Sequence, residues 1–242
     1  MAGDEGSEAL PPLRERRRAA AAQEILDAAE RHVTEQGPHA LSLRAVARSL
    51  GMTVQALYYY FPNRDALVTA LITKAYDELA DAVQVAVDAA DDAGTSGLLA
   101  AAESYRRWGM ANPERFQLLY GAPLRHYAAP AEGPTTQAVR RMGAIFERVL
   151  FGGYTEDQLA RADVPELSSA LLELAEQLPP GGLGSLPPPA IALFMSAWGH
   201  MHGLVVLEVF GHTDFLGEHQ AEIFRAAMRN MLQDIRGRIP SD

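Results

Sequence analysis

The sequence predicts an all-α protein with a small N-terminal helical unit and a larger C-terminal one. Apolar residues recur at helical spacing along most of the chain, and the alternation typical of β-strands is nearly absent. Proline or glycine bounds almost every apolar segment, as expected at the ends of helices. The chain has 242 residues, of which 48% are hydrophobic, so it is long enough to bury a substantial core.

The N-terminal part is predicted to form three helices followed by a long fourth one. Ile25, Ala28 and Ala29 keep the spacing of an amphipathic helix, which ends at Gly37-Pro38. Asn63 is suited to cap the long helix, because its side-chain oxygen accepts a hydrogen bond from the first turn. The predicted helices cover residues 17–36, 43–50, 54–60 and 63–90.

The C-terminal part is predicted to contain six further helices. They cover residues 96–111, 113–121, 134–152, 165–178, 188–210 and 216–237. The segments Gly121 to Pro134 and Leu178 to Pro189 are rich in proline, glycine and alanine. These two segments are therefore predicted to be mobile loops.

The net charge of −10 conceals an asymmetry along the chain. Residues 1–64 hold eight arginines and eight acidic residues, whereas residues 65–242 hold 13 basic and 23 acidic residues. Because phosphate binding requires basic side chains, nucleic acid is expected to bind only the N-terminal part. The arginines at positions 14, 16, 17 and 18 form either a solvated charge cluster or an arm that lies along a DNA backbone.

Composition also excludes several classes of protein. The chain has no cysteine, which excludes disulfides, thiolate metal sites and cysteine catalysis. The first residues lack the apolar run of a secretion signal, and no uninterrupted apolar stretch reaches the roughly 18 residues of a membrane span. We expect a cytoplasmic protein without a membrane partner.

Residues 42–67 carry the pattern of two short helices joined by a tight turn. Ser42 is predicted to cap the first helix and Thr53 the second, and Gly51 supplies the left-handed backbone of the turn. Such a pair places its second helix in the major groove of DNA. Residues 17–64 are therefore predicted to be a helix-turn-helix DNA-binding domain.

The second of these helices has two different faces. Leu57, Tyr60 and Phe61 share one side at positions i, i+3 and i+4, which is the spacing of an inner face. Tyr60 is as well suited to core packing as to DNA. The opposite side carries Gln55, Tyr58 and Tyr59.

This stretch resembles the TetR family of bacterial regulators. The family pattern runs from a glycine through a Leu-Tyr pair and a phenylalanine to a basic, an acidic and a leucine residue. It is met by Gly51, Met52, Thr53, Leu57, Tyr58, Phe61, Arg64, Asp65 and Leu67. The sequence departs from the pattern at Arg64, where lysine is commoner, and at Tyr60, where histidine is frequent.

The resemblance implies a set of DNA-binding residues. By this resemblance, Thr53, Tyr58 and Arg64 hold phosphates, which position the domain, while Gln55 and Tyr59 face the bases, which specify the sequence. The full set is Ser42, Arg44, Thr53, Val54, Gln55, Tyr58, Tyr59, Tyr60 and Arg64.

The segment Pro189 to Gly211 is apolar nearly all round, which predicts burial on more than one side. A dimer explains this, because one face then packs on its own domain and the other on a partner. Gly199 and Gly203 would permit close approach of helices. The predicted interface comprises Trp198, Gly199, Gly203, Val206, Phe210, Phe224, Met228 and Met231.

Trp198, His202 and Gly203 also look like the tryptophan, histidine, glycine signature of one group of TetR-type C-terminal domains. The resemblance implies an effector pocket in this half. Taken one at a time, core packing explains each aromatic residue of the predicted pocket better than a ligand contact does, and a hydrogen-bonded core or interface histidine explains His202 better than a ligand hydrogen bond does. The predicted pocket comprises Trp108, Phe116, Tyr120, Met142, Phe146, Trp198 and His202.

Four segments follow from these observations. They are a flexible arm at 1–16, the DNA-binding domain at 17–64, a connecting helix at 65–92, and a ligand-binding and dimerisation domain at 93–242. We expect a homodimeric repressor that is released from a palindromic double-stranded operator by a small hydrophobic effector.

Three other functions compete with that of an effector-released repressor. A regulator that needs no effector, or one that activates, fits the same residues. An enzyme using Glu208 or His202 lacks a nucleophile elbow, a phosphate-binding glycine loop or an HExxH motif. No metal is expected, since His200 and His202 point in nearly opposite directions on a helix, and no cofactor motif is present.

Overall fold

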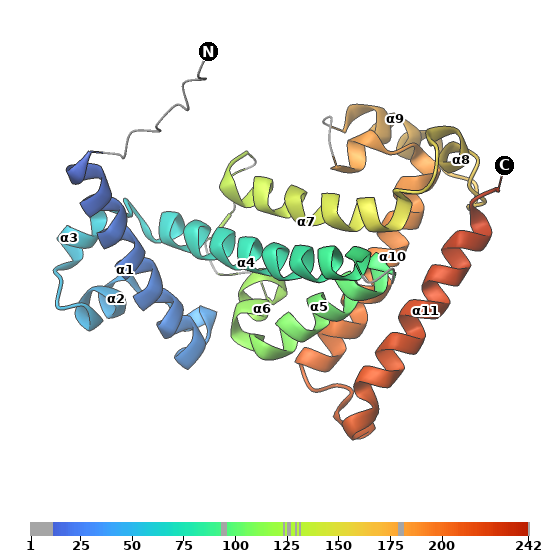
Figure 1. Cartoon of the computed structure of the whole chain (residues 1–242). Coiled ribbons are helices and arrows are strands. Elements are labelled where there is room, and N and C mark those ends of the chain that lie inside the picture. The colour runs from blue at the N-terminus through green and yellow to red at the C-terminus, as the bar shows by residue number, and fades with distance from the viewer. Residues whose placement is uncertain are drawn as a thin grey trace, which may run out of the picture. The chain divides into compact units, whose positions relative to one another are not determined.

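Figure 1 shows a computed structural model of the chain, in which the described residues form helices and no strands. The structure describes residues 12–92, 96–122, 124, 127–128, 130, 132–178 and 182–241. These residues divide into two compact units. Unit 1 contains the described residues of Met1–Leu71 and Ala122–Ala129, and unit 2 contains those of Ile72–Gly121 and Pro130–Asp242.

Unit 1 contains four helices and one 3-10 turn, and all four predicted helices are confirmed. They are α1 (Leu13–Gln36), η1 (Pro38–Ala40), α2 (Leu43–Ser49), α3 (Val54–Tyr58) and the start of α4 (Arg64–Asp92). The first helix begins at Leu13, four residues before the predicted start at Arg17, because the segment after Pro12 is rich in good helix formers. Arg14 and Arg16 therefore lie on a helix, and the rest of the predicted arm, residues 1–11, lies outside the described residues.

The core of unit 1 joins α1 to the helix pair α2 and α3. Ile25 and Val33 of α1, Val46 of α2 and Leu57 of α3 are all buried. Gly51 has a φ of 65°, which confirms the predicted left-handed residue in the turn between α2 and α3. Only glycine adopts this backbone without steric cost, so the turn depends on that residue.

Three caps are predicted in this unit, and two of them form capping hydrogen bonds, at Thr53 and Asn63. The hydroxyl of Thr53 accepts a hydrogen bond from the amide of Ala56 at 3.1 Å, and Asn63 accepts one from Ala66 at 2.7 Å. Both caps are confirmed. Ser42 occupies the N-cap position of α2, but its side chain makes no capping hydrogen bond, so that prediction is wrong in its chemistry.

Unit 2 contains the remainder of α4 and the rest of the helices. They are α5 (Gly97–Ala111), α6 (Pro113–Tyr120), α7 (Pro134–Phe151), α8 (Glu156–Ala160), α9 (Ser169–Gln177), η2 (Gly182–Ser185), α10 (Pro188–Val209), η3 (Asp214–His219) and α11 (Gln220–Arg238). The predicted bounds agree to within a few residues. Helix α9 begins later than predicted because Ser168 caps it, its hydroxyl accepting a hydrogen bond from Leu171.

Two local features were not anticipated. Helix α8 is held by a capping box in which Thr155 and Gln158 satisfy each other's backbone amides, a T-x-x-Q signal that is visible in the sequence. Gly217 has a φ of 54°, so residues 214–219 form a separate 3-10 segment and α11 starts only at Gln220.

Helix α10 packs against α5, α8 and α11. Among the described residues it is the one helix long and apolar enough to cross a membrane by length and composition. A core helix passes the same test, and seven of its residues are buried within unit 2. They are Ala190, Leu193, Phe194, Ala197, Met201, Val205 and Glu208.

A buried ion pair ties α5 to α10. Two nitrogens of the Arg106 guanidinium donate to the carboxylate of Glu208. Nε lies 2.6 Å from Oε2, and Nη2 donates to Oε1. Glu103 lies 3.6 Å from both Arg106 and Arg225, so the acidic and basic charges alternate. Glu208, one of the two residues named for the enzyme alternative, is thereby held by a guanidinium inside the fold.

Candidate functional site

The recognition helix α3 presents a polar and aromatic outer face. Leu57 is fully buried, while Tyr58 and Tyr59 keep 42% and 59% of their surface exposed. Gln55 is also exposed, and Tyr60 is half-buried. The structure thus separates Tyr60 from the two exposed tyrosines, as helical geometry requires for consecutive residues.

An arginine of α1 covers one of these tyrosines. The Arg18 guanidinium carbon lies 5.4 Å from the centroid of the Tyr59 ring, which is cation–π distance, and Tyr60 meets the same ring edge-on at 5.1 Å. Arg18 of α1 therefore adjoins the outer face of α3. This contact was not predicted, because nothing in the sequence links residues 41 positions apart.

The other predicted DNA residues lie around this surface. Arg44 is exposed on α2, whereas Ser42 and Val54 are half-buried at the starts of α2 and α3. The Nε of Arg64 donates to the carbonyl oxygen of Leu41 at 3.3 Å, so this guanidinium is anchored to the turn before α2. Thr53 carries both its capping bond and an exposed position.

The described part of the DNA-binding unit is basic, although the whole chain is acidic. Residues 12–64 contain eight arginines against the five acidic residues Glu15, Glu24, Asp27, Glu30 and Glu35. The α1 arginines at positions 14, 16, 17 and 18 are all exposed. This is the local charge that attraction to phosphates requires.

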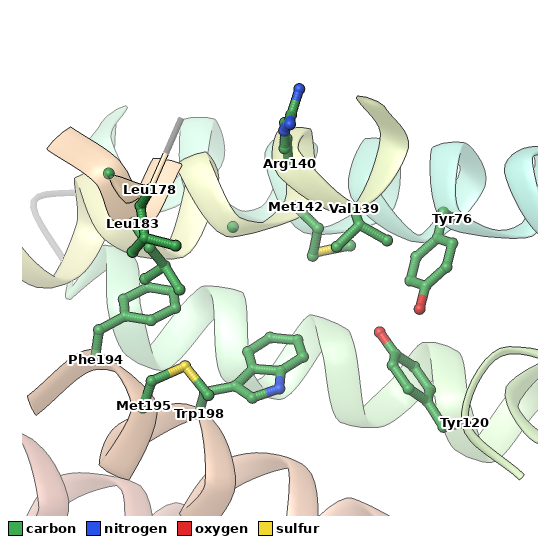
Figure 2. A pocket seen from close by; sticks show the side chains of 12 residues that line it. Tyr76, Tyr120, Val139, Arg140, Met142, Leu178, Leu183, Phe194, Met195 and Trp198 are labelled. Carbon is green, nitrogen blue, oxygen red and sulfur yellow. The ribbon is translucent and has the colours of Figure 1, made fainter. Parts of the chain in front are cut away.

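Unit 2 holds an apolar cavity of about 350 Å³. Its walls come from α4, α6, α7, α10 and η2, together with Leu178 directly after α9 (Figure 2). The volume lies within the range of small-molecule sites. The lining residues are Tyr76, Tyr120, Val139, Arg140, Met142, Gly143, Leu178, Leu183, Gly184, Phe194, Met195 and Trp198.

The structure brings three of the seven predicted pocket residues to this cavity. Tyr120, Met142 and Trp198 line it. Phe116 and Phe146 do not, because they are buried among other core side chains. Trp108 and His202 also lie outside the lining. Tyr76 was missed, although its spacing from Ile72 and Leu79 places it on the inner face of α4.

The cavity has an apolar end and a polar end. In Figure 2, Leu178, Leu183 and Phe194 gather at one end, while the hydroxyls of Tyr76 and Tyr120 point toward one another at the other. Among the described residues, Arg140 is the one charged member of the lining, and its guanidinium points away from the cavity and donates to Glu132 at 3.3 Å. None of the described acidic side chains lines the cavity.

The polar end continues into a buried hydrogen-bonded cluster. Tyr120 bonds both Tyr76 and Tyr105, and the Tyr105 hydroxyl lies 2.8 Å from Nδ1 of His202. Burial raises the pKa of all three tyrosines and lowers the pKa of His202, so every member is uncharged at neutral pH. His202 stacks on Trp198, and its place is that of a hydrogen-bonded core histidine.

The predicted interface residues fall into two groups. Phe224, Met228 and Met231 are buried in the core of unit 2, and their contact with a partner stays a prediction. They face inward because α11 turns its apolar stripe toward α10 and α5. Trp198 belongs to the cavity wall instead.

The remaining interface candidates lie at the surface of α10. Methyl groups placed on Gly199 or Gly203 would meet no atom within 4 Å, so both glycines face open space. Val206 is half-buried, and Phe210 is 41% exposed. His200 is exposed on this same helix, and no group of three or more His, Asp or Glu side chains among the described residues is placed to hold a metal.

Both halves of the chain match family models. Residues 25–71 match the bacterial regulatory proteins of the tetR family, and residues 98–231 match the tetracyclin repressor-like C-terminal domain. The HTH-type transcriptional regulator Rv1816 of Mycobacterium tuberculosis is 35% identical over 190 residues, which are 77% of this chain and 80% of that protein. The chain belongs to the TetR family.

Solved structures agree with this assignment. The regulatory protein SCO4313 superposes with a TM-score of 0.71 at 29% identity, over 92% of this chain and 100% of that one. RolR, whose crystal structure contains the ligand resorcinol, superposes with a TM-score of 0.52 at 15% identity, over 94% of this chain and 99% of that chain, which shows the shared fold alone.

Membership of the family establishes the general function. TetR family proteins are transcriptional regulators that bind DNA through the helix-turn-helix and act as dimers, and some bind small ligands. This chain is accordingly a DNA-binding transcriptional regulator. Unit 1 carries the helix-turn-helix, and unit 2 carries the cavity.

Proposed function

We propose that the protein is a homodimeric repressor that leaves a palindromic operator when a small hydrophobic effector enters the cavity of unit 2. The observation that carries this proposal is the position of Tyr76. It lines the cavity and belongs to α4, the same uninterrupted helix that begins at Arg64 beside the recognition helix in sequence.

Helix α4 is well suited to connect the two sites. It has 29 residues, which corresponds to a rod about 40 Å long. A ligand that pushes on Tyr76 therefore acts on a rigid element whose other end is part of the DNA-binding unit. For release, the effector must bind the non-operator conformation better than the operator-bound one, by about 1–3 kcal/mol in typical regulators.

The lining selects the kind of effector. Its side chains are apolar or aromatic, which favours a hydrophobic or aromatic compound over a sugar or a nucleotide. A polyanion is further disfavoured by the 23 acidic residues against 13 basic ones in residues 65–242.

The test uses operator DNA from the region that flanks the gene. Anisotropy of the labelled operator and tryptophan fluorescence are followed together while apolar aromatic and acyl compounds are added to the full-length protein. We expect quenching of Trp198, which lines the cavity, and release of DNA at the same ligand concentration. Quenching without release would mean that binding is not coupled to DNA, and release only by a charged metabolite would contradict the assignment of the cavity.

A cavity-filling variant provides the matched control. Gly143 lines the cavity, and a Cβ added there meets no atom within 4 Å, so the side chain of Gly143→Phe can start without a clash and its ring would take up cavity space. This change should abolish the response to the effector. Gly153→Phe places the same side chain at an equally open position outside the cavity and should leave the response unchanged.

A further inference from the structure

Four helices contribute one member each to the hydrogen-bonded cluster at the polar end of the cavity. Tyr76 belongs to α4, Tyr120 to α6, Tyr105 to α5 and His202 to α10. The order of the bonds is Tyr76, Tyr120, Tyr105, His202. Tyr105 is fully buried, whereas Tyr76 and Tyr120 line the cavity, so the cluster is a chain that opens into the cavity only at its tyrosine end.

The donors and acceptors of this hydrogen-bonded chain of four side chains can be ordered in two directions. Each tyrosine hydroxyl has a single hydrogen to donate, and neutral histidine carries its proton on one of its two nitrogens. If Nδ1 accepts from Tyr105, then Tyr120 must donate to Tyr105, and Tyr76 must donate to Tyr120. The hydroxyl oxygen of Tyr76 is then an acceptor that faces the cavity.

The opposite direction begins with a proton on Nδ1 of His202. Nδ1 then donates to Tyr105, whose own hydrogen must go to Tyr120 because an unpaired donor in a fully buried residue is costly. Tyr120 donates to Tyr76, and the hydroxyl hydrogen of Tyr76 is left to face the cavity. The same four residues therefore offer a ligand either an acceptor or a donor.

A charged ligand group would meet no opposite charge from the described residues at the polar end of the cavity. The tyrosines and His202 are uncharged at neutral pH, the lining formed by the described residues contains no acidic side chain, and the Arg140 guanidinium points outward to Glu132. A carboxylate or ammonium group placed beside Tyr76 would lose its hydration without gaining an opposite charge, which is strongly unfavourable. The other end, with Leu178, Leu183 and Phe194, suits only apolar groups (Figure 2).

We propose that Tyr76 and Tyr120 bind an uncharged hydrogen-bonding group of an otherwise apolar ligand, and that the chain reverses its direction to meet either a donor or an acceptor. This inference rests on the proposed function, since it describes the effector site of that function. It assigns the specificity of the site to two phenol hydroxyls and gives His202 the role of a positioning residue, whose tautomer follows the ligand.

Three probes of similar apolar character distinguish the possible ligand groups. Decan-2-one only accepts a hydrogen bond, 3-hexylindole only donates one, and decanoate carries a charge. Isothermal titration calorimetry on the full-length protein should show that both neutral probes bind at least about tenfold more tightly than decanoate. Tighter binding of decanoate than of either neutral probe would overturn the proposal.

The variants Tyr76→Phe and Tyr120→Phe remove one hydroxyl each and keep the ring. Each should weaken the binding of decan-2-one about tenfold, the effect of leaving one hydrogen bond unmade. Tyr154→Phe makes the same change outside the cavity lining and should have no effect. Thermal melting of each variant checks that it is folded, and unchanged affinity in both folded cavity variants would contradict the assignment.

The tautomer of His202 provides a measurement that would not change with the ligand if the role of this residue were purely structural. In ¹⁵N-histidine-labelled protein, Nδ1 of His202 should be protonated in the complex with decan-2-one, and Nε2 in the complex with 3-hexylindole. One tautomer in both complexes would refute the reversal of the chain.

Measuring operator release with the same probes distinguishes a failure of this inference from a failure of the proposed function on which it rests. Neutral probes that bind as described without releasing DNA contradict the effector role and leave the polar end in place. Decanoate that binds most tightly and releases DNA contradicts the polar end and supports the effector role. If none of the probes binds at millimolar concentration, both proposals fail.

Discussion

Three consecutive tyrosines at the end of α3 occupy three different environments. Tyr58 is exposed, Tyr59 is exposed but covered on one side by Arg18, and Tyr60 is half-buried with its edge against Tyr59. Each step along a helix rotates the side chain by about 100°, so neighbours in a run face different surroundings. The two exposed rings are therefore the ones available to DNA.

We predict different effects from the two exposed tyrosines. Tyr59→Ala should relax the preference for particular bases, because this ring lies on the surface assigned to base contacts. Tyr58→Ala should weaken the binding of all sequences alike and flatten its dependence on salt, as the loss of a phosphate contact does. Anisotropy with the operator and with single-base variants, at several salt concentrations, measures both effects. If Tyr59→Ala leaves affinity and base preference unchanged, the assignment of the recognition face is wrong.

At the scale of helices, charge as well as apolar burial holds unit 2 together. Arg106 of α5 reaches Glu208 of α10 with two donating groups, and its guanidinium carbon lies 5.7 Å from the ring of Phe224 on α11. Glu208 is 5% exposed. A buried pair of this kind is costly to break, because the charge that remains loses its bidentate partner; Arg106 would keep only the longer contact with Glu103 at 3.6 Å.

Breaking this pair should lower the stability of the protein. Glu208→Leu leaves Arg106 without its buried partner, and we expect a loss of about 3–5 kcal/mol in the free energy of unfolding. The double variant Arg106→Met with Glu208→Leu removes both charges and should recover most of that loss. Chemical denaturation measures the two values. A single variant as stable as the wild type would show that the pair contributes nothing to the packing of α5 on α10.

At the scale of the whole molecule, α10 packs one side into the core of unit 2 and exposes the other. Its buried residues face α5, α8 and α11, while Gly199, Gly203 and Phe210 lie on its outer side. The family acts as dimers. We propose that this outer side, rather than the inward residues of α11, forms the two-fold interface.

The glycines allow a clean test of this interface. Gly203→Arg adds a side chain where no atom lies within 4 Å, so it should not disturb the protomer, but it should block a close approach of two helices. We expect monomers in analytical ultracentrifugation and weaker binding to a palindromic operator. Gly153→Arg, which is equally open but lies after α7, is the control and should remain dimeric. A wild-type protein that is monomeric at micromolar concentration would remove both the interface and the palindrome.

Sequence pattern alone was sufficient to predict the order of the helices other than α8, and the recognition motif. Periodicity, proline and glycine punctuation and the caps at Thr53 and Asn63 are local signals, so they survive without knowledge of the fold. The capping box of α8 was equally local and was overlooked. The exposed positions of Tyr58 and Tyr59 follow from helical geometry.

Only the tertiary structure decided which apolar residues line the cavity and which fill the core. Phe116 and Phe146 are as aromatic as Tyr120 and Trp198, and no pattern in one helix tells whether its apolar stripe meets another helix or a void. The same holds for Tyr105 and His202, which meet across 97 positions of sequence. Local propensity sets where helices begin and end, but contacts between distant segments depend on how the helices pack, and that information is shared by the whole chain.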